Sequence, residues 1–297
     1  MQQSAGISKV RRFVSLARAA LALPLSHPTP SQANAVTLRK SPVMHAAEGV
    51  TFIVPLVSKE HVQDWPMVCK RLKATLQSFL AQTNPNWKAI IVGQDKPATL
   101  PDDPRIHFEP FTVPVEGNDK WIKLKAGCDA LAELSWTSGY AMSFDADDFA
   151  HVDLVDAALK EQASGYLITE GYLYDLSTKN LAKTGRQSLL RPYQKPFWKL
   201  CGSCALFRYD LSNGASEVAF LQETLQHEHR MFPYLAKLAQ RKLHPLPFPA
   251  ALYLINHGDN FSDRRGRGGF KTRLVEKAAI KDADTKRRVL QAFTMCE

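Results

Sequence analysis

The heptapeptide TFIVPLV at residues 51–57 begins the regular part of the chain and decides its fold class. It is short, apolar and rich in β-branched residues, which is typical of a strand buried on both faces. Asp64 and Pro66 then supply an N-cap and a first-turn proline, so a helix should follow at once. Residues 87–92, WKAIIV, repeat the pattern of a buried strand. The ordered part of the chain therefore opens with a strand, a helix and a second strand.

The same alternation continues as far as residue 150. Residues 105–108 and 140–144 are predicted strands, and apolar residues at helical spacing over 121–134 predict a helix between them. This order predicts an α/β domain with a mainly parallel central sheet flanked by helices. Ligands bind at the carboxyl ends of such strands, so three loops should line one crevice. These loops are residues 57–61, 93–96 and 145–149.

The pattern is less regular after residue 167. A helix is predicted at residues 217–239, with a break or kink at Pro233. The strands predicted in this part are residues 166–174, 204–209 and 250–255.

The composition is that of an ordinary globular protein. Of the 297 residues, 45% are hydrophobic and 23% are charged, which excludes disorder, collagen-like repeats and coiled coil for the whole chain. No run of about 18 uncharged apolar residues is present, so a membrane-spanning helix is not expected. Five cysteines, few and odd in number, suit a reducing compartment, and a cytoplasmic location is therefore predicted.

The first 48 residues differ from the rest. They carry six Lys and Arg residues against Glu48 alone, and hence +5 of the net charge of +9. Their basic start and apolar stretch imitate a signal peptide, but Arg18 interrupts the apolar stretch. We expect residues 1–48 to be a disordered or dispensable tail, with Met44 as an alternative start. Such a basic tail could also contact anionic lipid at the inner face of a membrane.

Three carboxylates occur within four residues directly after the strand at 140–144. They are Asp145, Asp147 and Asp148. Like charges this close repel one another, and a divalent cation with oxygen ligands would compensate them. Mg²⁺ or Mn²⁺, shared with phosphate groups of a substrate, is the natural choice. The alternative is an exposed acidic turn that caps a helix beginning near Asp153.

Four segments of the chain resemble, in order and spacing, the family 2 glycosyltransferases of the GT-A fold. They are residues 52–55, 76–83, 87–92 and the DxD-like segment 144–148. The resemblance covers roughly residues 50–262 and implies a nucleotide-binding half at 49–150 and an acceptor half at 151–262. A flexible basic loop and a C-terminal helix would follow at 263–297.

The activity that this resemblance implies is sugar transfer. A metal-dependent, inverting enzyme would move a sugar from a nucleoside-diphosphate sugar to an acceptor hydroxyl, for example of a cell-surface polysaccharide or glycoconjugate. The sugar, the acceptor and the oligomeric state stay open. The family has adjacent aspartates after its second strand, whereas this chain has Gly93-Gln94-Asp95, so the nucleotide base stays open as well.

The resemblance also implies which residues contact the donor. Lys120 and Lys123 could approach the nucleotide or belong to a solvated helix face. Arg264 and Arg267 lie in a glycine-rich loop that could fold over a bound anion; a solvated loop or an RNA-binding segment are the alternatives, and nucleic acid is not the predicted partner. The residues predicted to bind the nucleotide sugar are Pro55, Val57, Ser58, Glu60, Asp95, Lys120, Lys123, Asp145, Ala146, Asp147, Arg264 and Arg267.

The catalytic and metal-binding positions follow from the same resemblance. The acidic pair that opens a helix in the family falls on His227-Glu228, which makes Glu228 the predicted general base and Glu223 the reserve; an ordinary exposed helix glutamate is the alternative. His257, after the last strand, would complete a metal site with Asp145 and Asp147, or would be a loop histidine bonded to backbone.

The acceptor side is predicted from residues 198–204. Trp198 offers a stacking surface for a sugar, and Gly202 and Ser203 would line the acceptor part of the cleft. Cys201 and Cys204 have CxxC spacing, but a zinc site would need a second pair.

Three other functions remain open on the sequence alone. A nucleotidyltransferase would need a glycine-rich basic loop after the first strand, which residues 57–61 lack. An inactive module that binds nucleotide sugar or carbohydrate is the second, because the acidic pair is altered. A basic RNA-binding protein is the third, and its binding would weaken steeply with added salt.

Overall fold

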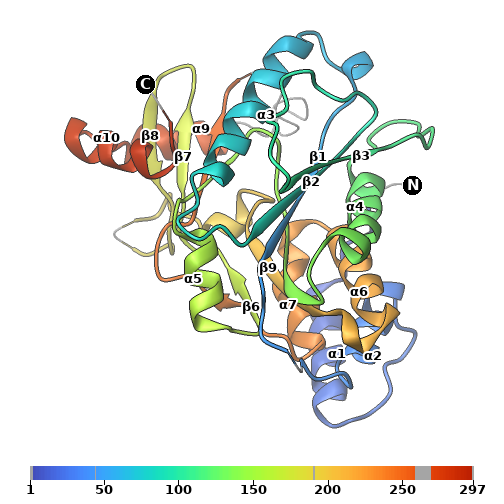
Figure 1. The fold of residues 1–297 in the computed structure, drawn as a ribbon. Helices are drawn as coiled ribbons and strands as arrows, with labels where there is room; N and C mark the ends of the chain where they lie inside the picture. The colour runs from blue at the N-terminus through green and yellow to red at the C-terminus, as the bar shows by residue number, and fades with distance from the viewer. Residues whose placement is uncertain (1–2, 44, 190, 258–268, 296–297) are drawn as a thin grey trace.

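The computed structural model describes residues 3–43, 45–189, 191–257 and 269–295 (Figure 1). Its centre is a seven-stranded sheet in the order β10-β6-β9-β4-β1-β2-β3. Strands β4, β1, β2 and β3 run parallel to one another, whereas β9 is antiparallel to both β4 and β6. The strands are β1 (Val50–Pro55), β2 (Trp87–Gly93), β3 (Ile106–Pro110), β4 (Ser138–Ser143), β6 (Gly165–Leu167), β9 (Ala205–Asp210) and β10 (His244–Pro245).

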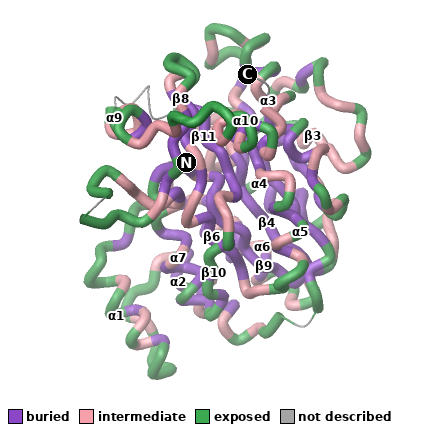
Figure 2. The backbone as a smooth tube through the Cα atoms, turned by 90° about the vertical axis from the view of Figure 1, so that its left-hand side faces the viewer, coloured by how far each residue is buried: buried purple, intermediate pink, exposed green. Residues whose placement is uncertain are grey.

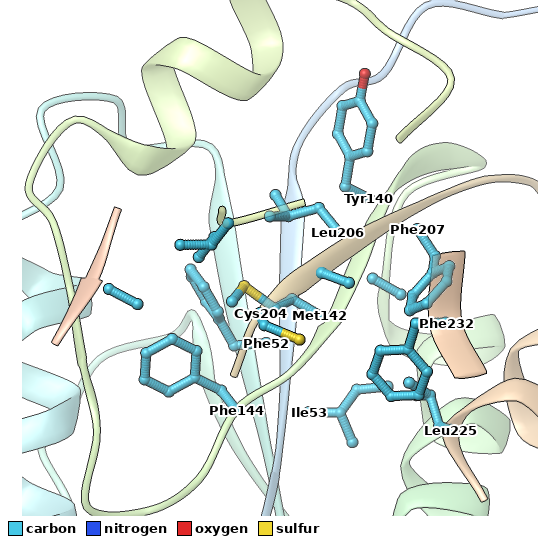
Figure 3. Packing of buried hydrophobic residues seen from close by; sticks show 14 of the residues in the cluster. Phe52, Ile53, Tyr140, Met142, Phe144, Cys204, Leu206, Phe207, Leu225 and Phe232 are labelled. Carbon is cyan, nitrogen blue, oxygen red and sulfur yellow. The ribbon is translucent and has the colours of Figure 1, made fainter. Parts of the chain in front are cut away.

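Helices α3 (Trp65–Leu80) and α4 (Lys120–Leu134) cover opposite faces of this sheet. Successive residues of a strand point to opposite faces. The ring of Phe52 stacks on Phe79 of α3 with centroids 4.0 Å apart. Ile53 instead faces α4, where a Cβ on Gly127 would come within 2.3 Å of its Cγ2, so only glycine permits this approach. Figure 3 shows Phe52 and Ile53 on the two sides of β1.

A smaller, four-stranded sheet has the order β5-β11-β7-β8. Its strands are β5 (Phe149–Ala150), β7 (Tyr172–Asp175), β8 (Asn180–Lys183) and β11 (Ala251–Ile255). Strand β11 is antiparallel to β5, with Leu252 opposite Phe149. The residues that follow Leu252 therefore run beside those that precede Phe149, and this brings the end of β11 to the turn at 145–148.

Further helices pack around these two sheets. They are α5 (Leu154–Glu161), α6 (Ala215–Leu225), α7 (Phe232–Leu238), α9 (Gly269–Ala278) and α10 (Ala283–Ala292), with the short 3₁₀ turns η1 (Lys59–His61), η2 (Phe197–Lys199), η3 (Leu211–Asn213) and η4 (His229–Met231). Figure 2 shows the central strands as the buried core of the molecule. None of the helices in the described ranges has the length and apolar character needed to cross a bilayer.

The N-terminal segment corrects the expectation of disorder for residues 1–48. Its described part contains α1 (Lys9–Ala20) and α2 (Pro30–Leu38), beside α6 and α7 (Figure 1). Ala35 and Leu38 of α2 are fully buried. Gln32 Nε2 donates to Tyr234 Oη of α7 at 2.7 Å. The low acid content misled the sequence interpretation, whereas a capping box between Thr29 and Gln32 is the local signal for α2.

The later half differs from its predicted pattern in two places. The predicted strand at 166–174 is two strands, β6 and β7, which belong to different sheets. The predicted helix at 217–239 is two helices, α6 and α7. Pro233 lies in the first turn of α7, where its missing N–H costs no hydrogen bond, so it begins a helix and does not kink one. The strands predicted from residue 50 to residue 144 are all present, as are the two helices between them.

Candidate functional site

The acidic turn between β4 and β5 is braced by the segment at 201–204. Asp148 is buried, and its Oδ2 accepts hydrogen bonds from Ser203 Oγ at 2.6 Å and Cys201 Sγ at 3.0 Å. The same Ser203 hydroxyl accepts from the Asp145 N–H at 2.9 Å. Burial, and then the charges of Asp147 and Asp145, raise the pKa of Asp148 well above its usual range. Asp148 is therefore an internal anchor of the turn, and Asp145 and Asp147 are left half-exposed.

Asp147 meets the histidine that follows β11. His257 Nε2 lies 2.8 Å from Asp147 Oδ2, although the two residues are 110 positions apart. The imidazole is 1% exposed and the carboxylate 23%. Among the described residues, the buried Nδ1 of His257 has no hydrogen-bond partner. Arg71 of α3 holds the backbone here by donating to the His257 carbonyl at 3.0 Å.

Asp145 is paired with Lys120, at the start of α4. Lys120 Nζ lies 2.5 Å from Asp145 Oδ1. Burial alone would lower the pKa of Lys120, but the charges of Asp145 and Asp147 and the hydrogen bond to Asp145 outweigh it and raise the pKa. Gly202 lies against this pair: a Cβ at that position would be 3.6 Å from Asp145 Oδ2 and 4.0 Å from Lys120 Nζ.

A cavity of about 270 Å³ opens beside the Lys120–Asp145 pair. Its charged wall is mostly cationic, because five Lys and Arg side chains face two carboxylates, Asp145 and Glu228. The cationic residues are Lys120, Lys195, Lys199, Arg230 and Lys271. The wall also contains Gln3 from the N-terminal segment and the apolar side chains of Trp121 and Phe232. Such a wall favours an anionic ligand that also presents an apolar or ring surface.

Two histidines of this wall were not predicted as site residues. His229 Nε2 is buried and has no hydrogen-bond partner in the described part of the chain. Burial, and then the charges of Arg230 and Lys120, lower the pKa of His229 to about 4, so the ring is neutral near pH 7. His227 is buried and lies 2.9 Å from Ser31 Oγ through its Nε2. The polar run at 227–230 between two apolar segments was the only sequence signal for either ring.

The cavity brings together Lys120, Asp145, Gly202 and Glu228 of the predicted site. Glu228 is exposed at the rim, as the residue before η4 and not inside a long helix. Asp147 and His257 lie in the same acidic turn region, as does half-exposed Ala146.

Lys123 and Ser203 correct the predictions made for them. Lys123 is fully buried, and its Nζ donates to the Leu56 carbonyl at 2.6 Å and pairs with Asp119 Oδ2 at 2.7 Å. Ser203 is also fully buried, and its hydroxyl is occupied by the acidic turn. Both side chains therefore hold loops in place and are not free to touch a ligand.

Glu223 and Trp198, two further predicted positions, do not line the cavity. Both are half-buried: Glu223 lies within α6, and Trp198 lies in η2 with Lys199 Nζ 5.2 Å from its ring centroid. Arg264 and Arg267 fall outside the described residues.

The loops after β1 and β2 meet each other, away from the described wall of the cavity. Asp95 Oδ2 accepts from Ser58 Oγ at 3.2 Å and from the Lys59 N–H at 2.9 Å. Asp95 thus braces the loop that follows Pro55, the last residue of β1, and carries Val57 and exposed Glu60.

The side chains near the acidic turn offer part of a coordination shell for a divalent ion. Across the described residues, no three His, Cys, Asp or Glu side chains are grouped so as to hold a metal ion. Asp147 and His257 nevertheless offer an oxygen and a nitrogen 2.8 Å apart. Neighbouring ligands of an octahedral ion with bonds of about 2.1 Å lie about 3 Å apart, so this pair suits adjacent positions of such a shell. Mn²⁺ accepts both kinds of ligand.

No protein-family model matches this sequence, and no curated protein matches it either. The structure defines the class of protein: an α/β protein with a mostly parallel central sheet.

Proposed function

We propose that the protein is a metal-dependent, inverting glycosyltransferase of the GT-A fold, which moves a sugar from a nucleoside-diphosphate sugar to an acceptor hydroxyl. The observation that carries this proposal is the contact between Asp147 and His257. Asp147 belongs to the acidic turn, and another residue of that turn, Asp145, lines the cavity. Two chain segments far apart in sequence supply these groups, next to a cation-rich cavity. An acidic turn that was simply exposed to solvent would have neither the histidine nor the cavity beside it.

The ion would be held by Asp147 and His257. When bound, Mn²⁺ or Mg²⁺ neutralises negative charge that grows on the leaving diphosphate. Lys120 would donate to a phosphate oxygen, and its position at the cavity wall beside Asp145 supports this role. Two further cations of the cavity wall, Lys199 and Arg230, would add to the positive field.

Glu228 would act as the general base. It is the one carboxylate besides Asp145 among the described residues of the cavity wall. In the proposed step Glu228 takes the proton of the acceptor hydroxyl, whose oxygen forms a bond to the anomeric carbon. The bond from that carbon to the diphosphate oxygen breaks on the opposite face, and the diphosphate leaves with the electron pair.

The test is a screen of UDP-, GDP- and dTDP-sugars with and without Mn²⁺. One nucleotide class should raise the melting temperature in a Mn²⁺-dependent way, because ligand binding stabilises the native state. Donor hydrolysis should also depend on Mn²⁺ and fall by about 100-fold or more in Asp147→Ala, a loss typical of removing one strong stabilising group. Asp102→Ala, at an exposed carboxylate away from the site, is the control. Undiminished Mn²⁺-dependent hydrolysis in purified Asp147→Ala would contradict the proposal.

A second candidate is a module that binds nucleotide sugar without transferring it. His227 favours this alternative, because it occupies the first position of the expected acidic pair and is buried against Ser31. Mn²⁺-dependent stabilisation by a nucleotide sugar, without hydrolysis or transfer to any acceptor, would select this candidate over the enzyme.

A further inference from the structure

Helix α1 exposes an apolar stripe. Val10, Phe13 and Val14 of the helix and Leu21, its C-cap residue, are 75%, 74%, 47% and 71% exposed. They are spaced by three, four and eleven positions from Val10, so they share one side of the helix. Ala17, on the same side, is also exposed. Figure 2 shows α1 at the margin of the molecule, largely exposed.

The opposite side of α1 is the side that packs on the protein. Ser15 and Ala19 are buried there, and Ser15 Oγ accepts a hydrogen bond from Gln32 of α2 at 2.9 Å. An amphipathic surface helix ordinarily turns its apolar side to the core. Here Ser15, Ala19 and half-buried Leu16 pack on the protein while Phe13 faces water, so the apolar stripe itself lacks a partner within the described protein. A contiguous exposed apolar surface of this kind marks a place of interaction.

Positive charges flank the stripe, and the sequence around it carries no acidic residue that could balance them. At 100° per residue, Arg11 and Arg18 lie along one margin of the stripe and Lys9 along the other. Residues 1–47 contain no Asp or Glu. Arg18 Nε donates to the Pro24 carbonyl at 2.7 Å, and Arg11 donates to the His27 carbonyl, so both guanidinium groups are bonded to neutral backbone.

We propose that α1 binds the surface of an anionic lipid bilayer, with its axis in the membrane plane and Phe13 inserted among the acyl chains. Lys9, Arg11 and Arg18 would then lie at the level of the lipid phosphates. A large apolar side with basic margins is the pattern of helices that lie in this interface. A second copy of the chain fits less well, because the basic margins of two such helices would meet each other.

The test is sedimentation of the full-length protein with vesicles of phosphatidylcholine, with and without phosphatidylserine. Binding should require phosphatidylserine and weaken with added salt. Arg11→Gln with Arg18→Gln should weaken binding by roughly 25-fold, or about fivefold for each charge. Phe13→Glu should weaken it by about tenfold or more, because an inserted aromatic ring is replaced by a charge. Val113→Glu, at a side chain that is 54% exposed elsewhere on the surface, should bind like the unaltered protein.

The proposal is overturned if vesicles with phosphatidylserine retain no more protein than those without it. It is also overturned if Phe13→Glu and Val113→Glu bind equally. Concentration-dependent self-association that Phe13→Glu abolishes, with no vesicle binding, would assign the stripe to a second copy. Unchanged thermal unfolding of Phe13→Glu would show that the helix is still seated. These readouts do not depend on sugar transfer.

Discussion

Two ion pairs of this protein have similar chemistry and different surroundings. Glu217 of α6 and Arg241 are 1% and 6% exposed, and their neighbours satisfy them further. Arg241 Nη1 also donates to the Arg208 carbonyl at 2.8 Å, and Glu217 Oε1 accepts from Asn213 at 2.8 Å. Lys120 and Asp145 are 27% and 29% exposed and line the cavity.

This contrast separates a structural ion pair from one that can bind a ligand. The Glu217–Arg241 pair uses its hydrogen-bonding capacity within the protein, so it holds α6 to the segment after α7. Lys120 and Asp145 keep accessible donor and acceptor atoms at the cavity wall. Burial and charge therefore do not mark a candidate site by themselves, and partial exposure at a cavity is what distinguishes these two pairs.

The largest effect on stability should come from breaking the buried Glu217–Arg241 pair. Glu217→Ala leaves the Arg241 charge buried without its carboxylate, and we expect the free energy of unfolding to fall by about 3–5 kcal/mol. Urea unfolding measures this change. Glu133→Ala, at an exposed glutamate of α4, should change it by less than about 0.5 kcal/mol. A loss below about 1 kcal/mol in Glu217→Ala would mean that the pair is not the structural contact described here.

Two lysines one turn apart on α4 sharpen the comparison. Lys123→Met removes the donor to Leu56 and the partner of Asp119, so we expect a loss of about 1–3 kcal/mol in stability. Lys120→Met should cost less than about 1 kcal/mol, because Asp145 can be hydrated. Its effect should instead appear as weaker binding of the Mn²⁺-dependent nucleotide ligand. Thermal unfolding and ligand titration of both variants provide the check, and equal losses of stability would remove the distinction.

The pH dependence of stability should report His229 at the cavity. Its folded-state pKa of about 4 lies below that of an unfolded histidine, about 6.5. The unfolded state thus binds a proton that the folded state does not, and the stability present above pH 6.5 is lost as the pH falls towards 4. Between pH 7 and pH 5 we expect a loss on the order of 1–2 kcal/mol that His229→Gln does not show. Identical losses in both proteins, measured by urea unfolding, would exclude His229 as the source.

The sequence predicts the parallel half of the fold well because local pattern and tertiary packing agree there. The alternation at residues 50–144 identifies each strand and helix, and Phe52 and Ile53 face opposite layers as a buried strand requires. The N-terminal helices were missed because composition was weighed above the Thr29–Gln32 capping signal.

The candidate site was predictable only in part. The position of Asp145 and Asp147 after β4 follows from the pattern. By contrast, Lys120 and Lys123 are one turn apart and carry the same charge. Only the packing around Leu56, whose carbonyl accepts from Lys123, leaves Lys120 accessible at the cavity and buries Lys123. His229 and Arg230 lie at the cavity because of the short turn η4, whose conformation cannot be predicted from hydrophobic periodicity.

The first residues of the chain form part of the cavity wall. Gln3 faces the cavity, and the Ser4 N–H donates to the Gln226 carbonyl at 3.0 Å. A shorter product translated from Met44 would leave this hollow open on one flank. It would also expose the apolar surfaces of α6 and α7 that α2 covers, and exposed apolar surfaces promote aggregation.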